Sequence, residues 1–295
     1  RLLLTKKVKE IYELSGISMP TLEKDNNLVD IDPFTVFGLF NKNLRVENRI
    51  KILNAIVKLF DLGSKVPNSF DGIPVLNNQN ATYYRFIDER SDDDIEDLWS
   101  LFLAALEFDK KKTTDNKEKV SHYFDIVNNK KGNGNSKTTI GLYWIAPDSF
   151  LNLDNPNQWY IFESGKFPTE ISSSLPSIGS KITAAKYFQI VETISSYFNS
   201  TEAKFKNFKE LSFEAWNCFE VVNKKNRELK MVAESSALMD DENETIMYWV
   251  YAPGEGSYMW EDFYKRGVMA IGWNEIGDLS LFKNKSEIKE AMKKI

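Results

Sequence analysis

The chain has 295 residues, of which 42% are apolar and 27% are charged, a composition typical of a globular protein long enough for two or three domains. Its formal net charge of −5 argues against indiscriminate coating of nucleic acid, and no apolar run approaches the roughly 20 residues of a membrane helix, so we expect a cytoplasmic protein without a membrane partner. A single cysteine, Cys218, and a single histidine, His122, exclude an internal disulfide, a cysteine zinc cluster and a multi-histidine metal site, and we expect no catalytic or metal-binding residues.

The first 31 residues predict a helix over Arg1–Leu14 that ends near Gly16, followed by a polar connector. Residues 32–232 mix two kinds of pattern. Helical periodicity marks Glu47–Leu62, the stretch after the acidic N-cap at Ser91, Ala184–Phe198 and Phe205–Val222. Short runs rich in β-branched and aromatic residues predict strands at Ala81–Ile87, Thr138–Ala146 and Trp159–Phe162. The fold class we predict is therefore α+β, with helices and a sheet in one N-terminal domain.

Two stretches of biased composition interrupt the helix and strand patterns. Residues 110–137 are rich in lysine, asparagine and glycine, which predicts a basic, flexible segment. Residues 233–245 are acidic and predict a linker to a last module at 246–295.

The run Gly132–Thr139 (GNGNSKTT) has some features of a phosphate-binding loop. Such a loop needs glycine immediately before its lysine and a helix after it, because the backbone N–H groups at the helix start hold the phosphates. Here Ser136 precedes Lys137, and we expect a strand to follow, so the sequence does not predict nucleotide binding at this place.

Tryptophan is concentrated in or next to the predicted strands, at Trp144, Trp159, Trp249 and Trp273. Aromatic residues in strands usually fill a core, but aromatic rings also build the pockets that hold a nucleobase extruded from a duplex. The pattern alone leaves both interpretations open.

The last fifty residues carry a more specific pattern. A Tyr248-Trp249 strand and a Pro253-Gly254 turn precede a Trp-x-x-Phe helix from Trp260 and the run Ile271-Gly272-Trp273, which leads to Gly277-Asp278-Leu279. This order resembles the start of the EVE-like branch of PUA-type domains in McrB-like proteins. The resemblance implies the first part of a β-barrel, in which an aromatic cage receives a modified base. Gly256-Ser257 replaces the usual Asn-Ala of the turn, so the resemblance does not identify the preferred base.

Upstream blocks resemble the N-terminal region that precedes the motor of many McrB-like restriction subunits. The blocks are Asp32–Asn41 (DPFTVFGLFN), Glu47–Arg49, Phe70–Asn78 (FDGIPVLNN), Asp94-Ile95 with Leu98-Trp99, and Ile140–Pro147 (IGLYWIAP). The resemblance implies a part of a longer defence protein that is not itself an enzyme. A separate AAA+ ring using GTP or ATP with Mg²⁺, through which the chain would self-associate, and an McrC-like nuclease subunit would act beside it, so we expect no cofactor in these residues.

From these patterns we predict a DNA-recognition part of an antiviral restriction system that flips and reads a base, either methylated or unmodified. Lysine exceeds acid between Lys181 and Lys230, and the predicted phosphate contacts are Lys181, Lys186, Lys204 and Lys206. The predicted base pocket comprises Trp249, Tyr251, Ser257, Trp260, Trp273 and Asp278. Two alternatives stay open: a protein-docking module of the same complex that reads no nucleic acid, and an RNA-binding PUA-type module.

Overall fold

The protein is described by a computed structural model that covers residues 2–77, 81–237, 260–266, 287 and 290. Within these residues the chain is mostly helical, and the only β pairing is one isolated parallel bridge between Lys42 and Leu76. The α+β prediction is therefore wrong, and in the part of the chain that can be described no sheet or barrel is present. The helices are α1 (Leu2–Ser15), α2 (Pro33–Gly38), α3 (Val46–Leu59), α4 (Asp94–Lys110), α5 (Thr114–Asn129), α6 (Asn135–Ile145), α7 (Asn155–Gln158), α8 (Thr169–Ser174), α9 (Ala184–Phe198), α10 (Phe208–Ala237) and α11 (Trp260–Arg266), with the 3-10 turn η1 (Lys24–Asn26) and the π-helical turn η3 (Trp159–Glu163).

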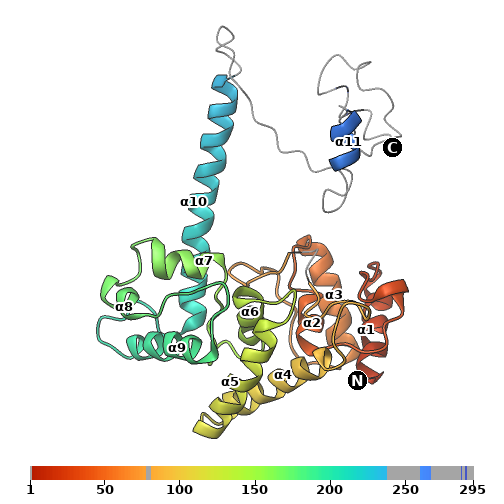
Figure 1. Cartoon of the computed structure of the whole chain (residues 1–295), viewed down its shortest axis with the longest axis horizontal. Helices are drawn as coiled ribbons and strands as arrows, with labels where there is room; N and C mark the ends of the chain where they lie inside the picture. The colour runs from red at the N-terminus through yellow and green to blue at the C-terminus, as the bar shows by residue number, and fades with distance from the viewer. Residues whose placement is uncertain (1, 78–80, 238–259, 267–286, 288–289, 291–295) are drawn as a thin grey trace. The chain divides into compact units, whose positions relative to one another are not determined.

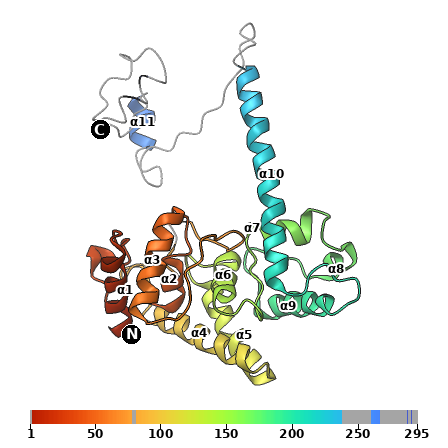
Figure 2. The same ribbon diagram turned by 180° about the vertical axis from the view of Figure 1, so that it is seen from behind.

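Residues 1–231 form one compact unit. Helices α1, α2 and α3 lie at one end, the antiparallel pair α4 and α5 runs beneath the middle, and α6 occupies the centre (Figure 1). At the other end α7, α8 and α9 surround the first turns of α10, as the view from behind also shows (Figure 2). The periodicity-based helices at the N-terminus, at Glu47–Leu62 and at Ala184–Phe198 are confirmed within a few residues.

The predicted strand Thr138–Ala146 is in fact most of the central helix α6. Every residue from Thr138 to Tyr143 is buried, so no polar face interrupts the apolar run. An apolar run of this kind has no periodicity that separates a buried strand from a buried helix. Gly141 lets α6 sit deep, because a Cβ there would lie 2.8 Å from a Phe34 ring atom and 2.9 Å from the Tyr83 hydroxyl.

The other two predicted strands are also wrong. Residues 81–87 are irregular, and the backbone N–H of Tyr83 donates to the Thr35 hydroxyl (2.8 Å) rather than to a neighbouring strand. Trp159–Phe162 falls in η3, whose aromatic rings pack against α10 and the 167–205 region. In both segments the backbone conformation depends on contacts with side chains distant in sequence, and strand propensity alone does not predict these contacts.

The predicted flexible segment at 110–137 is wrong as well, because α5 occupies most of it. Thr113 caps α5 through its side chain, and Val120, Phe124 and Val127 are fully buried against the neighbouring helices. Lys130 then pairs with both Asp94 and Asp97 of α4, at 2.7 Å each. Lys119 on α5 is exposed, whereas Lys130, just after α5, is largely buried between its two partners.

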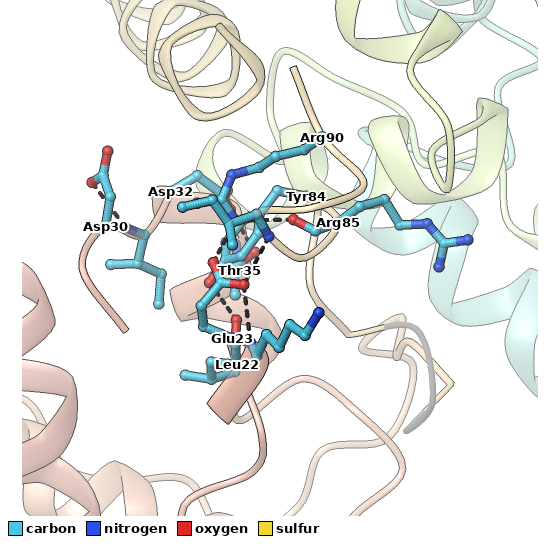
Figure 3. Close-up of polar contacts among 11 residues, drawn as sticks. Leu22, Glu23, Asp30, Asp32, Thr35, Tyr84, Arg85 and Arg90 are labelled. Atoms are coloured by element: carbon cyan, nitrogen blue, oxygen red, sulfur yellow. Dashed lines mark hydrogen bonds and ion pairs between the residues drawn. The ribbon is translucent and has the colours of Figure 1, made fainter. Parts of the chain in front are cut away.

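The connector before residue 32 belongs to the same unit as the rest of the body. The Glu23 carboxylate is only 2% exposed and accepts from the Ile87 N–H (2.9 Å) and from Arg90 (2.5 Å). The Tyr84 hydroxyl donates to the Leu22 carbonyl (3.0 Å), and the Arg90 guanidinium lies over the Tyr84 ring. Figure 3 shows these groups converging while the Arg85 side chain extends away from them. Residues 22–24 and 84–90 are thereby fixed together.

A second unit covers residues 232–295, of which α11 and parts of α10 are described. The first residues of the predicted acidic linker, 233–237, are helical and belong to α10. The rest of the linker and most of the predicted EVE-like module lie outside the described residues. Among the helices that the structure describes, none combines the length and the apolar character needed to cross a bilayer.

Candidate ligand pocket

An aromatic pocket of about 540 Å³ lies where α2, α3, α6, α10 and the loop at residues 67–73 meet. Its walls come from four of the sequence blocks quoted above, which are far apart along the chain. The lining side chains are Phe37, Phe40 and Asn41 after α2, Arg49 and Leu53 on α3, Phe70 to Ile73 in the loop, Tyr143, Trp144 and Pro147 around the end of α6, and Lys209 and Phe213 on α10. Pockets that hold a small ligand have this character, mostly apolar with a few placed polar groups.

Asp32 sets the direction in which α2 presents its phenylalanines. Its carboxylate caps the helix by accepting from the Thr35 N–H (3.0 Å) and the Thr35 hydroxyl (2.5 Å). Because the carboxylate is fully buried, desolvation raises the pKa of Asp32 to about 6. One helical turn later the Phe37 and Phe40 rings meet with centroids 5.7 Å apart at the pocket.

Arg49 is the buried charged group of the pocket, whereas Asp71 and Lys209 are exposed. Arg49 is 6% exposed, donates from Nη2 to the Asn41 Oδ1, and places its guanidinium 4.0 Å from the centre of the Phe70 ring. Its Nε is buried without a hydrogen-bond partner, and no described carboxylate pairs with it. Desolvation therefore lowers the pKa of Arg49 to about 10. A buried guanidinium without a counter-charge is costly, which makes this residue a candidate for ligand contact.

The loop at residues 70–77 is held in place from two directions. The Leu76 N–H donates to the Asn41 carbonyl (2.9 Å), and Trp144 donates from its indole to the Pro74 carbonyl (2.9 Å). Gly72 has φ +73°, and a Cβ there would lie 2.6 Å from the Phe213 ring, so the close approach of loop and α10 requires glycine. The aromatic walls are thus fixed by backbone contacts.

The run Gly132–Thr139 borders a second cavity, of about 730 Å³, that also touches α10. The expectation of a strand after this run is wrong, because α6 begins at Asn135. Lys137 is nevertheless not free to bind a phosphate, because its ammonium donates to the Thr82 and Gly132 carbonyls. Burial also lowers the pKa of Lys137 to about 8. Among the described residues no group of three His, Cys, Asp or Glu side chains could hold a metal ion.

The four predicted phosphate-contacting lysines do not form one group. Lys181 donates to the Asn128 and Asn133 carbonyls, and Lys204 pairs with Glu214 (2.8 Å) and reaches the Tyr160 hydroxyl (3.3 Å). Both side chains are therefore engaged within the protein. Lys186 on α9 and Lys206 before α10 are exposed, and no described carboxylate pairs with either ammonium.

Of the predicted base-pocket residues, only Trp260 is described. It begins α11, is 47% exposed, and stacks on Tyr264 with ring centroids 5.9 Å apart. The predictions for Trp249, Tyr251, Ser257, Trp273 and Asp278 lie outside the described residues.

Sequence reasoning did not select the pocket residues individually. Arg49, Phe70 and Trp144 stood inside the quoted blocks, but nothing in the sequence indicated that these blocks share one cavity. Asn41 ends the first block but was not distinguished from an ordinary turn asparagine, and Phe213 lies outside the blocks on a helix, where phenylalanine is common in any fold. The available signal was the density of aromatic residues in blocks that also contain turn residues.

Comparison with known proteins gives one match. A family model described as "Domain of unknown function (DUF8425)" matches residues 4–218, a range that contains every residue lining the aromatic pocket. No curated protein matches the chain, and no solved structure matches it. Because the family model covers most of the chain, the protein belongs to the DUF8425 family.

Proposed function

We propose that this chain is a DNA-recognition part of an McrB-like restriction and defence system, and that its aromatic pocket receives a nucleobase extruded from the duplex. The observation that carries the proposal is the pairing of aromatic walls with the buried, unneutralised Arg49 in one cavity. A base that leaves its stack loses stacking energy, which aromatic contacts can replace while a few hydrogen bonds identify its edge.

The origin of the pocket walls adds support. Four of the blocks whose sequence resembles the N-terminal region of McrB-like subunits supply them, at Asp32–Asn41, Glu47–Arg49, Phe70–Asn78 and Ile140–Pro147. Residues that serve only a core would be expected to pack fully, whereas here the rings of Phe37, Phe40 and Phe70 keep partly open surfaces around a cavity.

The remaining parts of the proposal concern groups around this pocket. Lys186 and Lys206 would contact phosphates, because their ammonium groups are exposed and have no described acidic partner. Trp260, whose ring is 47% exposed on α11, would add a further stacking surface for a base. Hydrolysis of GTP or ATP and DNA cleavage would belong to a motor ring and an McrC-like nuclease, so that this chain is not an enzyme and works in the cytoplasm.

The test is a binding titration of the full chain by fluorescence anisotropy, with duplexes that carry one unpaired base opposite an abasic site. We expect Phe70→Ala to weaken binding by about 10-fold, because base stacking on an aromatic ring contributes roughly 1–3 kcal/mol. The control is Phe60→Ala, which removes an exposed ring at the end of α3 that does not line the pocket. Equal affinities of the two variants would exclude the pocket as the base site.

A second candidate function, protein docking, is favoured by the exposed Ile73 and Phe213 at the mouth of the pocket, 41% and 49% exposed. An apolar rim of this kind also suits a peptide side chain of a partner subunit. A salt series separates the two functions, since phosphate contacts make DNA affinity fall steeply with salt. Absence of DNA or RNA binding at low salt would favour docking.

A further inference from the structure

The buried polar side chains of the aromatic pocket present hydrogen-bond donors to its interior. Arg49 is a donor only, and its contact with Asn41 fixes the orientation of the amide, because the amide oxygen must face the guanidinium. The Asn41 Nδ2 group is then turned away from Arg49, and the Nε–H of Arg49 is buried without a hydrogen-bond partner among the described residues. Both residues line the pocket.

The other polar side chains of the pocket are engaged elsewhere. The Trp144 indole donates to the Pro74 carbonyl, the Tyr143 hydroxyl interacts with Ser212, and Lys209 pairs with Asp148 at 2.7 Å. Asp71 could accept a hydrogen bond, but it is exposed and already holds the Ser69 hydroxyl (2.8 Å). The buried side-chain groups that remain for a ligand are therefore the N–H groups of Arg49 and Asn41.

A ligand that satisfies this wall must bring acceptors and no donor to the same edge. Guanine presents the adjacent acceptors O6 and N7 on its major-groove edge, and bidentate arginine contact with these atoms is the commonest specific contact in protein–DNA complexes. Adenine places its exocyclic amino group beside N7 on that edge, which would point hydrogens at the donors. Cytosine also places an amino group there, and its adjacent acceptors N3 and O2, which lie on the Watson–Crick edge, are not the pair that arginine most often contacts. Thymine offers a single acceptor there, beside a methyl group.

Resting on the proposed function, we propose that Arg49 and Asn41 are specificity-determining residues that select guanine as the extruded base. They donate to O6 and N7 while the rings of Phe37, Phe40, Phe70 and Trp144 contact the base. Guanine would thereby complete the hydrogen bonding of a guanidinium that lacks an acidic partner in the described protein.

The test uses the unmodified full chain and a set of duplexes that differ only in the base opposite one abasic site. The bases are guanine, 7-deazaguanine, adenine, cytosine, 5-methylcytosine and thymine. Replacing N7 by carbon removes one acceptor and leaves O6 in place, and we expect affinity to fall by about 10-fold relative to guanine, within the discrimination a bidentate contact gives. Adenine and cytosine should bind at least as weakly as 7-deazaguanine. Because the comparison changes only the DNA, it does not depend on the folding of a variant.

A variant pair assigns the preference to Arg49. Arg49→Gln should bind guanine and 7-deazaguanine equally, whereas Arg45→Gln, which changes an exposed arginine at the start of α3, should keep the difference. Equal affinity of the unmodified protein for guanine and 7-deazaguanine, or a preference for cytosine or 5-methylcytosine, would overturn the inference. In that case binding that still depends on Phe70 would leave the proposed function standing, whereas binding that ignores Phe70 would remove both.

Discussion

Arg49, which is 6% exposed, and Arg90, whose side chain is 9% exposed, should respond differently to removal of their charge. Arg90 pairs with Glu23, whereas Arg49 has no described acidic partner, and both guanidinium groups lie over an aromatic ring. We predict that Arg49→Met changes the free energy of unfolding by no more than about 1 kcal/mol, while Arg90→Met lowers it by about 3–5 kcal/mol, because the second variant leaves the buried Glu23 carboxylate unpaired.

The magnitude for Arg49 follows from two opposing contributions. Desolvation lowers the pKa of Arg49 from 12.5 to about 10, so burial disfavours its charge, by about 2 kcal/mol once the remaining solvent screening is allowed for. Methionine removes this cost, but it also loses the contact with the Phe70 ring, about 1 kcal/mol, and the charged hydrogen bond to Asn41, about 2 kcal/mol. The two contributions nearly cancel.

Urea unfolding at pH 7, followed by circular dichroism, measures both variants against the unmodified chain. Phe60→Ala serves as a surface reference, since that ring is exposed. If Arg49→Met proves as destabilising as Arg90→Met, then Arg49 is a structural residue, and the argument that its charge is kept for a ligand fails.

Further predictions concern groups that position the pocket. The pKa of Asp32, raised from 3.8 to about 6, means that the folded state holds a proton more tightly than the unfolded state, so stability should fall as pH rises from about 4 to 6; Asp32→Asn should flatten this part of the curve in urea unfolding from pH 4 to 7, and parallel curves would contradict the assignment. Gly141→Ala should lower the unfolding midpoint despite the better helix propensity of alanine, because its Cβ would meet Phe34 and Tyr83, and a raised midpoint would show that these rings yield freely. Lys130→Met should cost about 2–4 kcal/mol by leaving Asp94 and Asp97 side by side without their cation, whereas Lys131→Met, which changes an exposed lysine, should be nearly neutral.

The helices with one polar face could be predicted from the sequence, and those without one could not. Ala184–Phe198 and Glu47–Leu62 alternate buried and exposed positions with helical period, so their bounds were found within a few residues. Thr138–Ala146 has no exposed face, and its β-branched and aromatic residues are also typical of a strand. The sequence of α5 resembles that of a flexible segment, because lysines and other polar residues cover most of the helix and only a narrow side, with Val120, Phe124 and Val127, is buried.

The candidate site depends on long-range geometry, which explains why the sequence alone did not assemble it. Arg49 and Trp144 are separated by a long stretch of chain, and only the packing of α3 near the end of α6 places them in one cavity. The absence of an acidic partner for Arg49 cannot be read from its neighbours in sequence, since Glu47 stands only two positions away on the same helix.

The most direct test of the base pocket is the indole N–H resonance of Trp144, which lines the pocket and donates to the Pro74 carbonyl. In a titration of the full chain with a guanine duplex, followed by proton–nitrogen correlation spectra and assigned with Trp144→Phe, we expect this resonance to shift to saturation. The indole of Trp99, which donates to the Ile31 carbonyl (3.1 Å) away from the pocket, should stay in place. Saturating DNA binding with an unmoved Trp144 resonance would contradict the account.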